Sequence, residues 1–366
     1  MPPSGPDDPY ITLIESTPII NGRYHQPKAL RSAIREGHFS LLFVARDGKN
    51  GQDVVLKFFH PRHNNDSYRR HSFSREARLL SEFRGQPNIL QLLEEEQQFE
   101  VPLKTEQGIT VPFPLSFFVT ELAPASVKDY IYSDANNAKD SLLLFREICK
   151  GLQRIHRKNM VHRDLKPGNA LLFAHSVVKL CDFGTARKLD TDSLVPRYDR
   201  PVGDTRYTAL ELFCGMGNNP YFFFGADFFS LGAILFELFT RQMLTSLVYD
   251  GAVLEDLLEF FTRHVQDHQR TKQLDTLLPR VLTTWKLPDL YMVENLAPPS
   301  IRNRLDLFYK RLAELDYRNR AQIRFEWIFQ EIEILLKILT HEEKYRSWLE
   351  LKRRRRENEK RKRVTL

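Results

Sequence analysis

The chain has 366 residues, 42% of them hydrophobic, and a formal net charge of +7, which is enough sequence for two compact units with full apolar cores. The opening MPPSGPDDPY lacks the positive start and apolar run of a secretory signal, and the most apolar stretch, residues 222–239, is too interrupted by polar residues to span a bilayer. Cys149, Cys181 and Cys214 show no metal-like spacing and cannot all form disulfides, which is typical of a reducing compartment. We therefore expect a soluble cytoplasmic protein, or a nuclear one in a eukaryote.

The first third of the chain changes from an irregular pattern to a strand pattern. Residues 1–26 are proline-rich and polar without a usable period, and we expect an irregular N-terminal extension there. Residues 27–122 contain short β-branched and aromatic runs, one helical pattern over residues 67–83, and an insertion over residues 94–113 that is typical of a long hairpin. Strands are expected at residues 39–46, 53–59, 88–93 and 114–120.

The rest of the chain is helical in pattern. Apolar residues recur at helical spacing over residues 141–156, and similar spacing continues through residues 123–340. The sequence thus predicts an α+β fold, with a smaller β-rich lobe over residues 27–122 and a larger α-helical lobe over residues 123–340. Residues 341–366 form a helical and basic C-terminal tail.

The positive charge is concentrated in this tail. Residues 352–363, KRRRRENEKRKR, hold nine Lys or Arg and two Glu, so they carry +7 and leave 45 basic (54 − 9) and 45 acidic (47 − 2) residues elsewhere. The run has no apolar residue, so we expect it to be solvated. It suits a polyanion or an acidic partner, such as nucleic acid, an acidic protein or a nuclear-import receptor; a tail that only improves solubility is the alternative.

One segment combines charge with strand-like flanks. Residues 161–172, VHRDLKPGNALL, place an Arg, an Asp, a Lys and an Asn within seven residues. Burying such groups costs several kcal/mol unless they are paired, so their concentration indicates a site. Residues 162–169 match H-R-D-L-x-x-x-N, and Asp182-Phe183-Gly184 follows a strand-like run.

These two motifs closely resemble those of eukaryotic-type (Hanks-type) protein kinases, and the resemblance covers about residues 30–340. Lys166, directly after the first motif, is typical of the serine/threonine branch. The resemblance implies that Asp164 accepts the proton of a substrate hydroxyl and that Lys166 neutralises the γ-phosphate. Asn169 and Asp182 would hold Mg²⁺, or Mn²⁺, on the phosphates of ATP. A solvated charged turn is the alternative; His162 is expected to support the loop by packing.

The smaller lobe carries weaker matches to the same family. Residues 54–57, VVLK, resemble the family's strand whose lysine contacts the α- and β-phosphates. The resemblance implies that Lys57 has this role. Glu76 lies at the helix position that pairs with this lysine. A lysine extending from a sheet edge and a solvated glutamate are the alternatives. Arg75 and Arg78, on either side of Glu76, are expected to face solvent.

A third resemblance concerns the segment that binds adenine. Residues 120–123, TELA, are similar to the hinge that reads adenine through its backbone, which makes Glu121 and Ala123 ATP-binding residues. Thr120 would guard the back of the nucleotide site. Cys181, next to Asp182, is expected to be a small buried residue rather than a reactive thiol.

The glycine-rich loop departs from the family pattern. G-x-G-x-x-G aligns with residues 35–40, REGHFS, where only Gly37 remains to approach a phosphate. This departure concerns the affinity for the nucleotide and not the fold. Arg163 is expected to pair with a phosphorylated activation segment, for which the hydroxyls of residues 191, 193 and 198 are candidates, or with fixed negative charge at residues 199 and 204.

The larger lobe carries further correspondences. Ala209-Leu210-Glu211 resembles the A-P-E that closes the activation segment, and Glu211 is expected to pair with Arg320. Asp204 stands where the family has a threonine that contacts the substrate. Asp227 resembles the buried aspartate that anchors the catalytic loop and therefore needs partners.

The combined prediction is an ATP-dependent serine/threonine protein kinase that transfers the γ-phosphoryl group to a protein hydroxyl. Three alternatives stay open: a pseudokinase-like scaffold with weak nucleotide binding, a kinase acting on a small molecule, and a nucleic-acid-binding protein whose only support is the basic tail.

Overall fold

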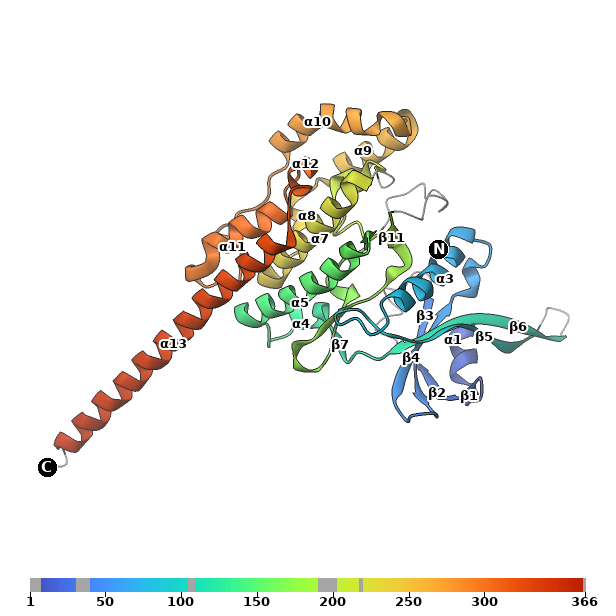
Figure 1. The fold of residues 1–366 in the computed structure, drawn as a ribbon, viewed down its shortest axis with the longest axis horizontal. Helices are drawn as coiled ribbons and strands as arrows, with labels where there is room; N and C mark the ends of the chain where they lie inside the picture. The colour runs from blue at the N-terminus through green and yellow to red at the C-terminus, as the bar shows by residue number, and fades with distance from the viewer. Residues whose placement is uncertain (1–7, 31–39, 105–108, 190–202, 217–219, 365–366) are drawn as a thin grey trace. The chain divides into compact units, whose positions relative to one another are not determined.

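The computed structural model describes residues 8–30, 40–104, 109–189, 203–216 and 220–364 (Figure 1). The chain divides into two compact units. Unit 1 comprises Met1–Val127 and Arg154–Tyr198, and unit 2 comprises Lys128–Gln153 and Asp199–Leu366. Unit 1 contains the larger sheet and unit 2 is mostly helical, which confirms the predicted α+β class. The lobe boundaries predicted after residues 122 and 340 stay predictions.

Unit 1 is built on an antiparallel sheet that has six strands within the described residues, in the order β1-β2-β3-β4-β6-β5. Along β3, buried Leu41, Phe43 and Ala45 alternate with more exposed residues, as expected for a half-buried strand. β5 and β6 form the long hairpin predicted from the insertion; they pair from Leu92↔Thr120 to Lys104↔Thr110, with register shifts between Leu92 and Gln97. The strands are β1 (Ile19–Ile20), β2 (Tyr24–Ala29), β3 (Ser40–Asp47), β4 (Asp53–Phe59), β5 (Leu92–Lys104) and β6 (Thr110–Glu121).

The N-terminal segment differs from the prediction. Residues 1–26 were expected to be irregular, but α1 (Pro9–Glu15), β1 and the start of β2 lie within them, so the prediction is wrong for residues 9–26 outside the turns. Asp8 caps α1 by accepting a hydrogen bond from the Tyr10 N–H at 3.0 Å. Ile11 and Ile14 are buried in the same core as the sheet residues Phe43 and Phe58. Seven residues are too few to establish a helical period, which is why the pattern gave no signal.

The helix α3 (Ser67–Glu82) begins after Asp66, whose side chain accepts a hydrogen bond from the Arg69 N–H at 3.0 Å. Its buried face includes Phe73, Ala77 and Leu80. The remaining strands of unit 1 are β7 (Ala125–Ser126), β8 (Met160–Val161), β9 (Ala170–Leu172), β10 (Val178–Leu180) and β11 (Arg187–Lys188). β7, β9 and β10 pair in one small sheet and β8 and β11 in another. Short 3₁₀ turns lie at Pro61–His63, Pro167–Asn169, Ala174–Ser176 and Phe183–Thr185.

Unit 2 is organised around α7 (Pro220–Thr240), which packs against α11 and α12. The Phe222 and Tyr317 rings meet edge to face, with 4.5 Å between centroids. Gly232 allows a close approach at the end of α11, because a Cβ there would lie 2.6 Å from the Ala313 nitrogen. The other helices are α4 (Val127–Ile131), α5 (Ala138–Arg157), α6 (Leu210–Phe213), α8 (Leu244–Val248), α9 (Gly251–His264), α10 (Arg270–Thr284), α11 (Pro299–Leu312), α12 (Tyr317–Arg320) and α13 (Phe325–Val364), with a 3₁₀ turn at Asp267–Gln269.

The apolar composition of α7 bears on whether this helix could cross a membrane. Contrary to the prediction from residues 222–239, the stretch Phe222–Thr240 is long and apolar enough to cross a membrane by length and composition. However, 94% of it is buried inside the fold. Burial as the central helix of unit 2 therefore accounts for its composition.

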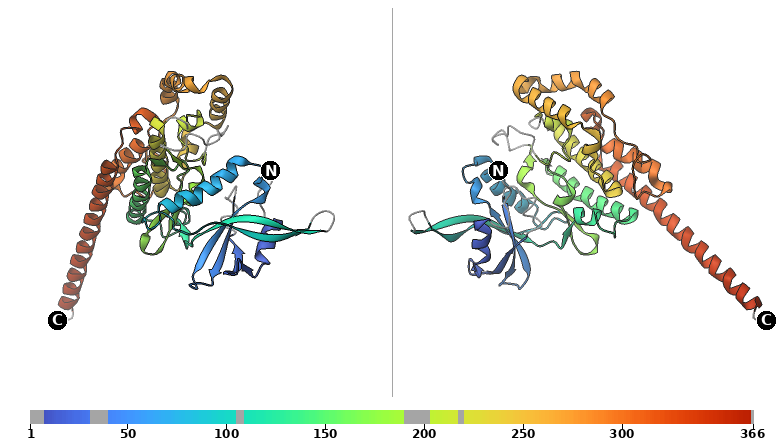
Figure 2. Two further views of the ribbon diagram at one scale, coloured as in Figure 1. Left: turned by 45° about the vertical axis from the view of Figure 1, so that its right-hand side comes forward. Right: turned by 180° about the vertical axis from the view of Figure 1, so that it is seen from behind.

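The helix α13 confirms the helical pattern predicted before the basic run and extends through it. Its first half packs on α11 through the buried side chains of Ile328, Ile332, Leu335 and Leu339. The second half runs on beyond the other helices of unit 2 in all three views (Figures 1 and 2). Lys352, at the start of the basic run, is exposed, as predicted for a solvated segment.

Candidate active site

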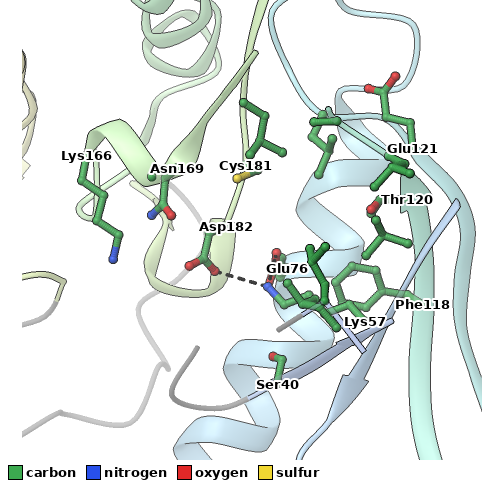
Figure 3. Close-up of a pocket in the computed structure, with 18 residues that line it drawn as sticks. Ser40, Lys57, Glu76, Phe118, Thr120, Glu121, Lys166, Asn169, Cys181 and Asp182 are labelled. Atoms are coloured by element: carbon green, nitrogen blue, oxygen red, sulfur yellow. Dashed lines mark hydrogen bonds and ion pairs between the residues drawn. The ribbon is translucent and has the colours of Figure 1, made fainter. Parts of the chain in front are cut away.

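Three charged side chains from β4, α3 and the segment after β10 meet in unit 1. The Lys57 Nζ lies 2.8 Å from both Glu76 carboxylate oxygens and 3.4 Å from Asp182 Oδ1 (Figure 3). The predicted ion pair between Lys57 and Glu76 is therefore present. Because their side chains are only 16% and 5% exposed, neither residue is a solvated surface charge. β4 is buried on both sides of Lys57, at Leu56 and Phe58, and the lysine is half-buried where its amine reaches Glu76 of α3.

The electrostatics of this cluster follow from burial and from the neighbouring charges. Burial opposes the charge on Lys57, but Asp182 and Glu76 outweigh it and hold the lysine pKa above its usual value. Burial raises the pKa of Glu76 to about 7, although Lys57 acts in the opposite direction. For Asp182, burial also raises the pKa, but Lys57 and Lys166 outweigh burial and keep it below its usual value. Asp182 is therefore a carboxylate at neutral pH.

The loop between β8 and β9 brings the other predicted polar residues together. Asn169 donates through Nδ2 to the Asp164 carbonyl at 2.8 Å and to Asp164 Oδ2 at 3.0 Å. Lys166 Nζ lies 3.3 Å from the same Asp164 oxygen. The 3₁₀ turn at Pro167–Asn169 lies within this loop, so the three side chains converge in one tight segment of the chain.

The neighbouring segment, Asp182 to Gly184, is fixed by packing behind it. The Phe183 ring lies 5.3 Å from the His162 ring and 5.6 Å from the Phe83 ring, centroid to centroid. The His162 Nε2 is 3.0 Å from the Cys181 carbonyl oxygen, and its side chain is buried. His162 thus supports the loop by packing, as predicted.

A cavity of about 240 Å³ is lined by five of these residues: Lys57, Glu76, Lys166, Asn169 and Asp182. Its polar end is formed by Lys57, Glu76 and Asp182, and its apolar walls include Leu42, Val55 and Leu171. The cavity has the mixed lining expected of a small-molecule site. The predicted hinge also lines it, and its remaining lining residues are Leu30, Ser40, Leu90, Phe118, Thr120, Glu121, Leu122, Ala123, Gly168 and Cys181.

The hinge shows a contact that the sequence did not predict. The Glu121 carboxylate pairs with Lys179 of β10 at 2.6 Å and accepts a hydrogen bond from the Gln91 N–H at 2.8 Å. Any contact of Glu121 with a nucleotide therefore falls to its backbone, because its side chain is already engaged. Cys181 was expected to be buried, but it is half-buried and lines the cavity. Its surroundings still raise the pKa of its thiol, in agreement with the prediction of an unreactive cysteine.

The residues expected to hold a metal ion suit Mg²⁺. No group of three or more His, Cys, Asp or Glu side chains placed to hold a metal occurs among the described residues. Mg²⁺ commonly takes one or two protein oxygens and completes its shell with water and phosphate. Asp182 offers a charged carboxylate; because Asn169 donates its Nδ2 to Asp164, its amide oxygen is turned toward the Asp182 side (Figure 3).

One prediction about this region is wrong. Arg75 was expected to face solvent, but it is 3% exposed and donates through Nη2 to the Gly184 carbonyl oxygen. Arg78, three residues further along α3, is exposed as predicted. Charged residues on a helix are usually solvated, so the local sequence held no signal for the difference.

Some of the predicted residues lie outside the described part of the chain. These are Gly37 with most of the expected phosphate loop, and the candidate phosphorylation sites at residues 191, 193 and 198 together with residue 199. Ser40, at the end of the predicted loop, lines the cavity.

Unit 2 contains the other predicted correspondences. Glu211 and Arg320 form an ion pair with both side chains fully buried, as predicted. Asp204 makes a two-pronged pair with Arg206, at 2.6 and 2.9 Å, that the sequence did not predict. Asp227 is 1% exposed, as expected for an anchoring residue; its proposed link to the catalytic loop stays a prediction.

A second buried network in unit 2 was not predicted. The Glu237 carboxylate accepts hydrogen bonds from the Tyr207 hydroxyl at 2.6 Å and from the Tyr132 hydroxyl at 2.8 Å. Burial raises the pKa of Glu237 above its usual value, and the two phenol donors partly offset this effect. The network ties the segment before α6 to α7.

Comparison with known proteins identifies the family. The family model for the protein kinase domain matches residues 29–337. The chain therefore belongs to the protein kinase family and has its two-lobed α+β fold.

Curated relatives carry kinase names. Serine/threonine-protein kinase TIO of Arabidopsis thaliana is 31% identical over 222 residues, which cover 59% of this chain and 15% of TIO. Mitogen-activated protein kinase 15 of Rattus norvegicus is 29% identical over 62% of this chain and 39% of its own length. Serine/threonine kinase NLK of Caenorhabditis elegans is 27% identical over 84% of this chain and 48% of its own length. The chain thus spans less than half the length of each of these relatives.

Proposed function

We propose that this protein is an ATP-dependent serine/threonine protein kinase that transfers the γ-phosphoryl group of ATP to a protein hydroxyl. The observation that carries the proposal is the arrangement of polar groups at one cavity. The Lys57–Glu76–Asp182 cluster lines it together with Lys166 and Asn169, and these last two residues contact the Asp164 carboxylate. Membership of the protein kinase family and the names of the relatives support it.

In this proposal the chain binds and orients the nucleotide from both ends of the cavity. The backbone of Glu121 and Ala123 holds the adenine, and Lys57, held by Glu76, contacts the α- and β-phosphates. Gly37 is assigned to the phosphates by resemblance. Asp182 and Asn169 hold Mg²⁺, which supplies charge neutralisation on the phosphate oxygens. A cavity of about 240 Å³ with a polar and an apolar end fits such a ligand.

The proposed chemical step rests on Asp164 and Lys166. Asp164 orients the substrate hydroxyl and accepts its proton, while Lys166 stabilises the negative charge on the transferred phosphoryl group. Lys166 lines the cavity, and its Nζ lies 3.3 Å from the Asp164 carboxylate. Asn169 holds the Asp164 carboxylate in place through its Nδ2.

The decisive experiment compares Asp164→Asn with the wild type in the transfer of labelled phosphate from ATP with Mg²⁺ to a generic protein substrate. We expect a loss of at least about a hundredfold in kcat, because the amide keeps the shape of the carboxylate but accepts no proton. Nucleotide binding should persist. Asp134→Asn, at an exposed aspartate of unit 2, is the matched control and should leave the rate unchanged.

The same experiment separates the proposal from its alternatives. A wild type that binds ATP but phosphorylates neither itself nor any protein would favour the pseudokinase-like scaffold. Transfer to a small hydroxylated molecule, but not to protein, would favour the small-molecule kinase. Asp204 makes the substrate platform unusual, since its carboxylate is engaged by Arg206 where the family has a threonine.

We further propose that the end of α13 binds a polyanion or an acidic partner protein. Just before the basic run, Tyr345, Trp348 and Leu349 are 55%, 51% and 43% exposed. Lys352 lies over the Trp348 ring, 4.7 Å from its centroid. An exposed apolar face joined to a positive run favours an acidic protein surface over duplex DNA, because duplex DNA would be bound chiefly through its phosphate charge.

Removing residues 352–366 should abolish binding to poly-glutamate and to duplex DNA at low salt and leave phosphorylation of peptides unchanged, because the rest of the chain is formally neutral. Trp348→Ala should weaken binding to an acidic protein but not to DNA. Equal affinities of the truncated and full chains would exclude a binding role. We also propose a reducing, cytoplasmic or nuclear environment, which the free thiols of Cys149, Cys181 and Cys214 support.

A further inference from the structure

Two consecutive residues of α3 hold the same turn of unit 1. The Glu76 carboxylate accepts a hydrogen bond from the Phe183 N–H in addition to its pair with Lys57. Arg75 donates through Nη2 to the carbonyl oxygen of the next residue, Gly184. One residue of the helix thus binds a backbone donor of the turn, and its neighbour binds a backbone acceptor.

The turn lies close to the helix at this point. A Cβ on Gly184 would be 3.7 Å from Glu76 Oε2 and 3.9 Å from the Ser72 carbonyl oxygen. Arg75 Nη2 also lies 3.4 Å from Ser72 Oγ. The guanidinium is therefore enclosed between α3 and the turn, and leaving this position would expose or strand a buried charge.

Asp182, at the start of the turn, has a backbone conformation that needs such support. Its φ of 64° and ψ of 68° lie in the left-handed region, which residues other than glycine adopt uncommonly, although aspartate tolerates it better than most. In this conformation its carboxylate lies 3.4 Å from Lys57 Nζ. Releasing the Gly184 carbonyl would free the turn to relax.

We propose that Arg75 is a positioning residue for phosphoryl transfer: it clamps the Asp182–Gly184 turn to α3 and so keeps the Asp182 carboxylate beside Lys57. The proposal rests on the proposed kinase function for its effect on rate, but the clamp itself is a property of the fold. Arg75 is absent from the cavity lining, and its contact is with the backbone of the turn rather than with the cavity.

The test compares Arg75→Gln and Arg75→Lys with the wild type. Arg75→Gln should lower kcat by about 10- to 100-fold, since it removes a charged hydrogen bond to the turn, and should raise the Mg²⁺ concentration needed for half-maximal rate. The KM for the protein substrate should stay within about twofold. Arg75→Lys keeps a charged donor and should recover a substantial part of the rate. Arg70→Gln, at an exposed arginine of α3, is the matched control and should behave as wild type.

Hydrogen exchange over residues 181–186 provides a readout that needs no kinase activity. Arg75→Gln should speed exchange of this segment relative to the rest of unit 1, while Arg70→Gln should not. If the wild type transfers no phosphate, the proposed function is wrong. The hydrogen-exchange rates of residues 181–186 still test whether Arg75 holds the turn against α3. If Arg75→Gln does not fold, Arg75→Lys carries both measurements. The proposal would be overturned if a folded Arg75→Gln variant showed unchanged hydrogen exchange and unchanged kcat. It would also be overturned if Arg75→Gln and Arg75→Lys lost stability equally without a change in kcat per folded molecule.

Discussion

Glu211 and Arg320 form an ion pair across 109 positions of sequence, and both side chains are fully excluded from solvent. Arg320 also donates through Nε to the Gly225 carbonyl oxygen at 2.9 Å, so the pair connects α6, α7 and α12. A buried charge that loses its partner keeps its desolvation penalty.

Arg320→Met should therefore lower the free energy of unfolding by about 3–5 kcal/mol, because it leaves Glu211 buried without a partner. The double variant Glu211→Gln/Arg320→Met should recover part of this loss, because no uncompensated charge remains. Urea denaturation measures both. Arg318→Met, at a half-exposed arginine of the same helix, should cost no more than about 1 kcal/mol. A similar small cost for Arg320→Met would contradict the assignment.

The raised pKa of Glu76 predicts opposite pH effects on rate and stability. Burial raises this pKa to about 7, so lowering the pH from about 8 to about 6 should protonate Glu76, break its ion pair with Lys57 and reduce phosphoryl transfer. A folded-state pKa above the unfolded value contributes stability that is present at low pH and lost as the pH rises toward 7. Rates and unfolding curves of wild type and Glu76→Gln measure both effects; the variant should lack the difference. Parallel pH profiles of the two proteins would exclude Glu76 as the titrating group.

The buried N-terminal helix predicts that residues before the family match stabilise unit 1. Ile14 is 0% exposed in the sheet core, so Ile14→Ala should lower the free energy of unfolding by about 2–5 kcal/mol. Thr12→Ala, at an exposed position of α1, should change it by less than about 0.5 kcal/mol. Thermal or urea unfolding provides the measurement. Equal effects of the two substitutions would mean that α1 is not packed on the sheet.

The ion pair between Glu121 and Lys179 predicts that the Glu121 side chain contributes to the stability of the protein but not to its affinity for ATP. Glu121→Gln should change the affinity for ATP by less than about threefold, because the carboxylate is engaged by Lys179 and the Gln91 N–H. It should lower the free energy of unfolding by about 1 kcal/mol, the usual value of a partly exposed pair. Calorimetry with an ATP analogue and urea unfolding test the two parts. A large loss of affinity with unchanged stability would show that the side chain itself contacts the nucleotide.

The sequence alone was sufficient for the chemistry of the catalytic loop and for most of the strands. Asp164, Lys166 and Asn169 lie within six residues of one another, so a single tight turn brings them together and the motif contains its own geometry. The strand predicted at residues 53–59 coincides with β4, because its run of β-branched and aromatic residues is a local property. The ion pairs of Lys57 with Glu76 and of Glu211 with Arg320 followed from resemblance to the family.

The tertiary structure alone decided which ordinary-looking residues are buried. Arg75 and Arg78 are the same residue type on one helix, but Arg75 meets the Gly184 carbonyl and Arg78 faces outward. Lys179 meets Glu121 across 58 positions of sequence, and α1 is stable because Ile11 and Ile14 find the core of the sheet. Each of these outcomes depends on a partner far away in the chain. Local propensity contains no term for such a partner, whereas the free energy of burying a side chain depends almost entirely on it.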